Sequence, residues 1–456
     1  MKSLKWVAKA AWMVVAVGLV AAAGVPARSA AVRGGTLTIA WPADEEPANL
    51  DAQVDPYDST KLLNSFIADP LIRLNPDGRY APALATAWTV SPDGKVWTLT
   101  LRKGAKFQDG TPFNAAAVKF NIDRIMDPNT HSAELANFLG AANFKHADIV
   151  NDSTVKITYS GPVPIAFWGL SVAPMWSPAA VKQYSGGFPQ HLTGAGPFSL
   201  AEWVRGDHIK FVKNPGYTAG PPLQSHAGPA YLDGITVRFV GDQGVLGQVL
   251  KSGEANLVVE LPSQSLNEYR HNANYRIVLG FQPGTGMQFV MNTSRPALSD
   301  IRVRKALRFA YEPDKINQTL YGGDYVTVKG PLTPSSRFYW KGAEAAYHYD
   351  AAKARSLLDE AGWKVNTQTG MREKEGKPLS LTLVMLHHKQ IGEYLAAQLK
   401  QIGVDLQVAV VPGPVQLQRA QSGDFDLIYE RQRTFEPDGS LFAIWYSKND
   451  KPGGWA

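Results

Sequence analysis

The feature that most constrains the fold of this 456-residue chain is a regular alternation of short apolar strands with amphipathic helices in its second half. The alternation begins at about Tyr231 and continues to about residue 429. The patterns predict strands at 235–240, 256–260, 287–292, 379–386, 404–411 and 425–429, with helices at 245–251, 300–311, 350–361, 391–402 and 415–421. Such alternation is typical of an α/β fold with a parallel sheet covered by helices.

The preceding region, from residue 35 to about 231, is richer in strands and is interrupted often by Pro and Gly. Its patterns predict strands at 36–41 and 96–101, helices at 61–74 and 115–126, and a hairpin formed by 148–150 and 154–159. Asn114 and Ser299 are the expected N-caps of the helices that follow them. The change of pattern near residues 289–292 predicts a first, larger lobe at 32–288 and a second at 289–456.

Residues 1–31 have the layout of a secretory signal peptide. Three lysines precede an uncharged stretch from residue 10 to 25, and small residues at Ser29 and Ala31 favour cleavage before Val32. The uncharged stretch is shorter than the roughly 20 apolar residues of a spanning helix. Because no cysteine follows it, a lipid anchor is excluded, and we expect an exported, soluble protein.

Composition excludes several classes of function. The chain has no cysteine, so disulfides, thiolate metal sites and cysteine nucleophiles are excluded. Outside the leader, 42 basic residues face 40 acidic ones, so the charge does not support a nucleic-acid partner. No later stretch approaches the length and apolarity of a membrane span.

Catalytic patterns are also missing from the sequence. It contains no nucleophile elbow, P-loop or dinucleotide fingerprint. His387 and His388 are adjacent, and adjacent side chains on an extended segment point to opposite sides, so we expect no metal site and no cofactor. The acidic groups at 44–46 and 359–360 are interpreted as solvated surface. A hydrolase is therefore disfavoured, and the chain is predicted not to be an enzyme.

Several short runs occur together and in order along the chain. They are GGTL (34–37), PALA (82–85), SPDG (91–94), LRKG (101–104), FQDGTPF (107–113), GAGPF (194–198), NPGY (214–217), IRVRKAL (301–307), EAG (360–362) and QIGV (401–404). In this combination the chain resembles the family 5 extracytoplasmic solute-binding proteins, which serve dipeptide, oligopeptide, nickel and glutathione ABC transporters. The run from 107 to 118 is most similar to the glutathione-binding branch.

The resemblance implies a two-lobed periplasmic binding protein fold with an enlarged first lobe and a hinge between the lobes. It further implies a monomer in the periplasm that closes over a small molecule or short peptide and docks on an ABC permease of the inner membrane. The alternative of the same fold is a sensory or chaperone-like peptide-binding protein.

Loop position and family pattern together point to six ligand contacts. Ligands of parallel α/β sheets lie beyond the carboxyl ends of strands, which favours the loops at 55–60, 385–389 and 430–438. The candidate residues are Tyr57, Asp58, His387, His388, Arg433 and Trp445. Each could equally be an ordinary surface or core residue.

Two positions depart from the family pattern. If Pro437 is the family's proline, Arg433 stands where peptide binders carry an Asp for the peptide amino group. A guanidinium favours a carboxylate or phosphate, so a ligand with an acidic group is expected rather than a free-amine dipeptide, unless Arg433 instead faces solvent or a neighbouring Glu. The family also continues beyond the region of Tyr446 with a return crossing into the first lobe, so the second lobe is expected to be truncated.

Overall fold

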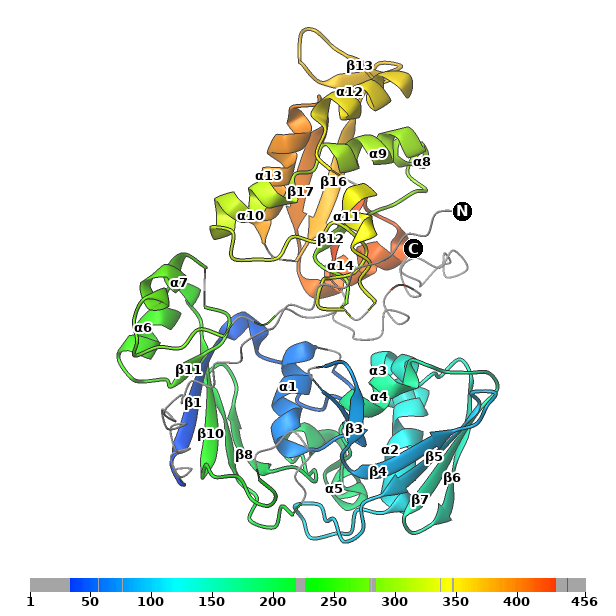
Figure 1. The fold of residues 1–456 in the computed structure, drawn as a ribbon, viewed down its shortest axis with the longest axis vertical. Coiled ribbons are helices and arrows are strands. Elements are labelled where there is room, and N and C mark those ends of the chain that lie inside the picture. Colours follow the sequence, from blue (N-terminus) through cyan, green and yellow to red (C-terminus); the bar gives the residue numbers. More distant parts are fainter. Residues whose placement is uncertain are drawn as a thin grey trace, which may run out of the picture.

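The computed structural model describes residues 33–55, 57–75, 77–218, 226–261, 263–278, 280, 284–336, 338–346, 348–386, 388–431 and 441. Figure 1 shows two bodies, one above the other, each built around its own sheets. We use "first lobe" for the described residues from 33 to 280 and "second lobe" for those from 284 to 431. The expected signal peptide at 1–31 lies outside the described residues.

The first lobe contains two large sheets and a small one. One is five-stranded, in the order β11 (Leu257–Val258), β1 (Thr36–Pro42), β10 (Gly234–Val240), β9 (His208–Lys213) and β8 (Phe198–Val204). The other is four-stranded and antiparallel, in the order β4 (Ala85–Val90), β5 (Val96–Leu101), β7 (Thr154–Tyr159) and β6 (Phe144–Asn151). β2 (Ile72–Leu74) and β3 (Tyr80–Pro82) form a separate pair.

Helices cover these sheets and lie between them (Figure 1). They are α1 (Asp58–Ile67), α2 (Ala115–Met126), α3 (Ala133–Phe138), α4 (Ala166–Val172), α5 (Pro178–Tyr184), α6 (Leu246–Lys251) and α7 (Ser263–Arg270). The predicted cap of α2 is confirmed, because the Asn114 side chain accepts a hydrogen bond from the Ala117 N–H at 3.1 Å.

The predicted helix at 61–74 is wrong at both ends. α1 begins at Asp58 and stops at Ile67, and residues 72–74 form β2 instead. Pro70 accounts for the early stop, because its ring disfavours helical backbone at Asp69 and it cannot donate a helical hydrogen bond.

The second lobe is built on one four-stranded sheet in the order β12 (Gln288–Met291), β18 (Leu427–Glu430), β16 (Ser380–Met385) and β17 (Asp405–Val410). β16 is parallel to both β17 and β18, as the alternation predicts, whereas β12 is antiparallel to β18. The predicted strands β10 and β11 do not join this sheet; both pair with β1 in the first lobe.

The second-lobe helices and a small three-stranded sheet surround that sheet. The helices are α8 (Pro296–Ser299), α9 (Ile301–Phe309), α10 (Pro313–Tyr321), α11 (Gly342–Ala346), α12 (Ala351–Glu360), α13 (Lys389–Lys400) and α14 (Gly413–Ser422). The small sheet holds β13 (Lys364–Val365), β14 (Arg372–Lys374) and β15 (Lys377–Pro378). The predicted Ser299 cap of α9 is wrong: Asp300 caps it, accepting from the Arg302 N–H at 2.8 Å, while Ser299 ends α8.

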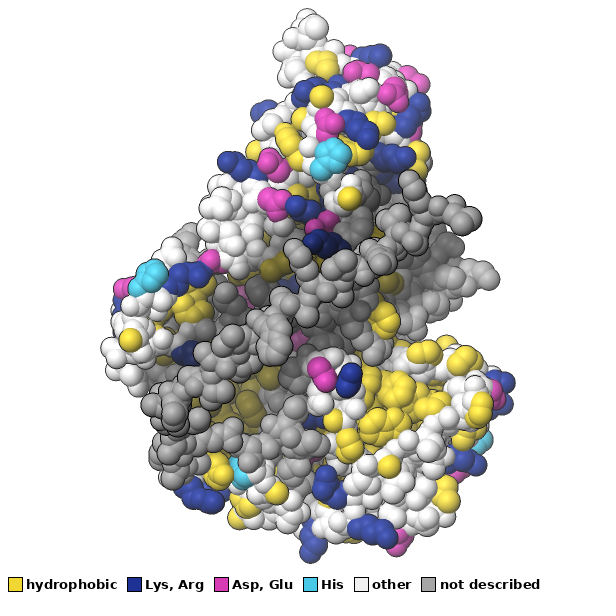
Figure 2. Space-filling view, viewed as in Figure 1, with side chains coloured by type: hydrophobic (Ala, Val, Ile, Leu, Met, Phe, Trp, Pro, Cys, Tyr) yellow, Lys and Arg dark blue, Asp and Glu magenta, His cyan; other side chains and the backbone are white. Residues whose placement is uncertain are grey.

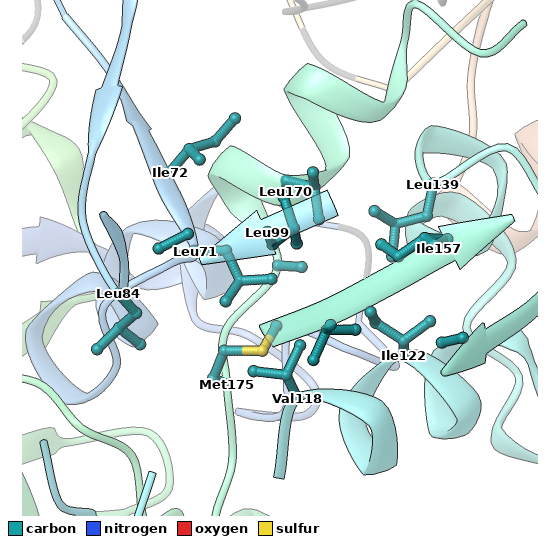
Figure 3. Packing of buried hydrophobic residues seen from close by; sticks show 14 of the residues in the cluster. Leu71, Ile72, Leu84, Leu99, Val118, Ile122, Leu139, Ile157, Leu170 and Met175 are labelled. Atoms are coloured by element: carbon teal, nitrogen blue, oxygen red, sulfur yellow. The ribbon is translucent and has the colours of Figure 1, made fainter. Parts of the chain in front are cut away.

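Separate apolar cores stabilise these parts. Figure 3 shows how side chains of the four-stranded sheet, such as Leu99 and Ile157, meet Val118 and Ile122 of α2 and Leu170 of α4. A second core lies under the five-stranded sheet, and a third fills the space between the second-lobe sheet and α9, α12 and α13. Figure 2 shows basic and acidic side chains interspersed over the outer surface of both lobes.

Candidate functional site

The carboxyl ends of parallel strands from both lobes point to the same region. In the first lobe β1 is parallel to β10 and β11, and the chain continues from β1 into residues 43–45 and from β11 to Glu260. In the second lobe β18 ends at Glu430 and is followed by Arg431. The charge of Arg431 lowers the pKa of both Glu45 and Glu260, so the two edges are near enough to interact electrostatically.

This interlobe region is rich in carboxylates. Burial raises the pKa of Glu45, and the negative charges of Glu260 and Asp44 raise it further, while Arg431 opposes them. Burial also raises the pKa of Glu260, although that residue is exposed on one side. Removing a carboxylate from water disfavours its charged form, and for both glutamates this effect is larger than the opposing attraction of Arg431.

The second-lobe edge adds a buried aromatic and a buried carboxylate. Tyr429 is 4% exposed and Glu430 is 7% exposed. Burial raises the pKa of the Tyr429 hydroxyl. The Gln416 side chain of α14 donates to the Tyr429 carbonyl at 2.8 Å, which joins the first turn of α14 to β18. These contacts give the second-lobe edge a fixed shape.

Two of the predicted site residues lie at the start of α1. The ring of Tyr57 is 54% exposed, and its backbone N–H donates to the Asp55 carboxylate at 2.9 Å. Asp58 is the first residue of α1, and its charge is one of those that raise the pKa of Glu45. Its carboxylate lies 3.7 Å from the Lys61 ammonium. The structure therefore brings Tyr57 and Asp58 to the same region as the carboxylates described above.

The other predicted residues have different outcomes. His388 follows β16 and has its ring centroid 6.3 Å from that of Tyr429, so it lies at the second-lobe edge. Its φ of 59° is left-handed, and the residue serves as the N-cap of α13. His387, Arg433 and Trp445 lie outside the described residues.

Sequence reasoning missed Glu45 and Glu260 as members of this region, and it included Glu430 only as the first residue of an expected ligand loop, not as a ligand contact. The interpretation of residues 44–46 as solvated surface is wrong for Glu46, whose carboxylate accepts hydrogen bonds from the Trp203 indole at 3.1 Å and the Gly206 N–H at 3.0 Å. Glu45 is half-buried beside the other lobe. The available signal was position, since Glu45 lies in the turn after β1, Glu260 comes shortly after β11, and Glu430 is the last residue of β18.

Two other features of the described residues bear on chemistry. Among them no group of three or more His, Asp or Glu side chains is arranged to hold a metal ion. Over the same residues, no helix combines the length and the apolarity needed to cross a bilayer. A surface hollow of about 480 Å³ lies away from the interlobe region, between α2 and α5, and is bordered by Phe120 and Lys182.

Solved structures of binding proteins share this architecture. NikA from Brucella suis, in complex with Fe(III)-EDTA, has a TM-score of 0.77 at 25% identity, over 92% of this chain and 83% of that one. DppA from Helicobacter pylori, in complex with the peptide STSA, has a TM-score of 0.75 at 22% identity, over 93% and 83%. The chain therefore has the mixed α/β fold of periplasmic binding proteins, as expected.

Sequence comparison points the same way. The family described as bacterial extracellular solute-binding proteins, family 5, matches residues 79–453. A glutathione-binding protein of Salmonella typhimurium is 31% identical over 366 residues, which cover 78% of this chain and 67% of that protein. Members of this family bind solutes for ABC transporters and are not enzymes, in agreement with the expectation from sequence. The chain belongs to family 5 of the bacterial extracellular solute-binding proteins.

Proposed function

We propose that this protein is the substrate-binding component of an ABC importer and captures a peptide or peptide-like small solute between its lobes. The observation that carries the proposal is the meeting of two strand edges, one from each lobe, lined by Glu45, Glu260, Glu430 and Arg431. A ligand that contacts both edges stabilises the form in which the lobes are close together. That form then delivers the ligand to a membrane permease.

The charges of the described residues favour a ligand with a free amino group, in contrast to the expectation drawn from Arg433, which lies outside the described residues. Carboxylates outnumber cations among the described residues there, and an ammonium would relieve the burial cost that raises the pKa values of Glu45 and Glu260. Arg431 offers a guanidinium for a carboxylate at the other end of the ligand. Short peptides carry both groups. Relatives named for glutathione, and the solved structures with peptides, support this class of ligand.

The proposal also covers the six ligand contacts predicted from the sequence, the boundary between the lobes, and the state of the protein in the cell. Tyr57, Asp58, His387, His388, Arg433 and Trp445 are proposed to contact the ligand, and the lobes are proposed to divide at residues 288 and 289. We further propose that the protein acts as a monomer in the periplasm after removal of residues 1–31. If Arg433 also faces the ligand, a second acidic group on the ligand would be favoured, as in glutathione.

Mass spectrometry of the ligand that co-purifies with the protein tests the proposal directly. The protein is isolated from the periplasm under native conditions, and released small molecules are identified. Calorimetry with reduced glutathione, a dipeptide and its N-acetylated form then measures the role of the amino group. We expect the free dipeptide to bind at least about tenfold more tightly than the acetylated one, corresponding to about 1.4 kcal/mol. Equal affinity, or turnover of the peptide, would contradict the proposal.

A further inference from the structure

One contact between the lobes depends on a single glycine. A Cβ atom built on Gly413, at the start of α14, would lie 3.3 Å from the Tyr57 hydroxyl oxygen and 3.8 Å from a methyl group of Leu386. A separation of 3.3 Å is tighter than ordinary van der Waals contact, so even an alanine requires its neighbour to move. Tyr57 belongs to the first lobe and Gly413 to the second. The tyrosine tip therefore reaches the opposite lobe where that lobe has no side chain.

The first-lobe side of this contact is held firmly. The Asp55 carboxylate, on a residue only 5% exposed, accepts from the Tyr57 N–H and from the Thr60 hydroxyl, both at 2.9 Å. The Tyr57 carbonyl accepts from the Lys61 N–H at 3.2 Å in the first turn of α1. The backbone of Tyr57 is thus fixed at both of its polar groups, while more than half of the residue stays exposed.

The second-lobe side is equally fixed. Gly413 lies between Pro412 and the proline that follows it, and both Val415 and Gln416 donate backbone hydrogen bonds to the Pro412 carbonyl at 3.0 Å. The buried Gln416 side chain joins this turn to Tyr429 of β18. Because both backbones are anchored, a closer approach of the lobes at this point requires the Tyr57 side chain to turn away from Gly413.

We infer that Tyr57 and Gly413 form a built-in stop that sets how closely the two lobes approach. Tyr57 positions the first lobe against the second, in addition to exposing its ring at the proposed site. The absence of a side chain at Gly413 determines how close the two lobes come at this point. A larger residue at 413 would hold the lobes farther apart and reduce the fraction of molecules able to contact a ligand with both edges. The effect on ligand affinity rests on the proposed function, but the effect on lobe distance does not.

The absence of cysteine makes the distance measurable. One cysteine is introduced in each lobe, at Val204 of β8 and at Val365 of β13, because these residues are 40% and 49% exposed. Since the parent sequence has no cysteine, spin labels or fluorophores attach only at these two positions. The interlobe distance is then compared in the full chain without ligand for the parent, Gly413→Ala, Gly413→Leu and Tyr57→Ala. We expect the distance distribution to shift to longer values in the order parent, Gly413→Ala, Gly413→Leu.

The double variant Tyr57→Ala/Gly413→Leu separates the stop from damage to α14. Gly413 precedes a proline, where a side chain disfavours helical backbone, so a substitution has a local cost that does not depend on Tyr57. If the stop operates, removing the tyrosine ring returns the distance of the Gly413→Leu protein toward that of Tyr57→Ala alone. If the longer distance persists in the double variant, the inference is wrong. Unchanged distances in both Gly413 variants, with unchanged melting temperatures, would also overturn it.

Reduced glutathione serves as the ligand probe in a separate arm. If it binds the parent, Gly413→Leu is expected to weaken binding about tenfold or more, and Tyr57→Phe, which removes only the hydroxyl, is expected to weaken it less. A Gly413→Leu variant that shows a longer distance but unchanged glutathione affinity overturns the link to ligand capture and leaves the stop itself intact. If the parent binds none of the peptide probes, the proposed function is contradicted. The interlobe distances measured without ligand still show whether Tyr57 and Gly413 limit the approach of the lobes.

Discussion

The two lobes are stabilised in different ways. The first lobe has two large apolar cores, one under each of its main sheets, and a buried polar network lies between them. The second lobe packs its main core against one face of a single sheet and carries a smaller cluster on the other face. Specific hydrogen bonds fix the two large cores of the first lobe relative to each other, whereas in the second lobe a single sheet carries the apolar packing on its two faces.

The first-lobe network centres on Asp51, which is 1% exposed. Its carboxylate accepts from the Arg124 guanidinium at 2.6 Å and from the Trp176 indole at 2.8 Å. Gln53 extends the network by donating to the Asn121 side chain at 2.7 Å. Trp176 belongs to the core of the five-stranded sheet, and α2, which carries Asn121 and Arg124, packs in the other core. The network therefore fixes the two cores against each other.

A comparable feature of the second lobe is the side chain of Arg372, which is 2% exposed. It donates to the Ile402 carbonyl at 2.8 Å, the Trp363 carbonyl at 2.5 Å and the Asp359 carboxylate at 2.8 Å. The interpretation of residues 359–360 as solvated surface is thus incomplete, because Asp359 pairs with a buried cation. Arg372 satisfies carbonyls at the edge of the lobe rather than joining two cores.

The largest expected effect comes from breaking the first-lobe network. Asp51→Ala removes the carboxylate that accepts from the half-buried Arg124 guanidinium, the Trp176 indole and the Gln53 backbone N–H. Breaking a buried pair in this way costs about 3–5 kcal/mol. We expect the free energy of unfolding to fall by that amount in urea titrations followed by tryptophan fluorescence. Asp148→Ala, on the exposed strand β6, is the matched control and should change it by less than about 0.5 kcal/mol.

The corresponding change in the second lobe is Arg372→Met. It removes the donor from two backbone carbonyls and one carboxylate while keeping much of the apolar stem, so we expect a loss of about 2–3 kcal/mol. If the lobes unfold separately, this loss appears in a different transition from that of Asp51→Ala. Arg355→Met, at an exposed position of α12, is the control. If Asp51→Ala and Arg372→Met lower the free energy of unfolding equally, in a single transition, the two lobes are not stabilised in different ways.

Gln108 offers a sharper test of the link between the first-lobe cores. Its side chain donates to the Ile67 carbonyl at 2.8 Å and the Phe198 carbonyl at 2.7 Å and accepts from the Gly194 N–H at 2.8 Å. Gln108→Ala is expected to cost about 1–3 kcal/mol, because buried partners lose their hydrogen bonds. Faster amide hydrogen exchange near residues 194 and 198, with β16 and β17 unaffected, would locate the effect. Gln190→Ala, on an exposed residue, is the control.

The smallest expected effect is at the meeting of the lobes. The pKa values of Glu45 and Glu260 are raised above 4.5, so protonation favours the folded protein and that stabilisation is lost as the pH rises through their raised pKa values. Glu45→Gln/Glu260→Gln is therefore expected to melt slightly above the parent at pH 7 and close to it at pH 4.

Glu202 provides a control, because its pKa is lowered whereas those of Glu45 and Glu260 are raised. Hydrogen bonds from Lys210 and His208 hold its pKa below the usual value, so its ionised form favours the folded state. Glu202→Gln should lower the melting temperature slightly at pH 7, and the difference from the parent should shrink toward pH 4. A lower melting temperature of the double glutamine variant at pH 7 would contradict the raised pKa values of Glu45 and Glu260.

Much of the secondary structure follows from local patterns. The strand Val96–Leu101 and the helix Ala115–Met126 have the predicted bounds, because alternation and a polar N-cap act within a few residues. Errors occurred where one residue overrides a pattern, as Pro70 does after α1, or where two adjacent residues compete to be a cap, as Ser299 and Asp300 do before α9.

The candidate site was less predictable. Tyr57, Asp58 and His388 could be proposed because residues after strand ends share an edge in parallel sheets. Glu45 and Glu260 could not, because an acidic residue on a polar turn has the same local pattern whether it faces water or another lobe.

The sequence alone determined the family, the alternation that builds the second-lobe sheet, and the absence of thiol chemistry, because each of these is written in residue types and their spacing. Tertiary structure alone decided which sheet β10 and β11 join, which carboxylates meet between the lobes, and that Tyr57 approaches Gly413. These features depend on contacts between residues about 200 or more positions apart, or on burial that no local pattern records. The desolvation of a carboxylate and the space left by a missing Cβ exist only once both lobes are folded.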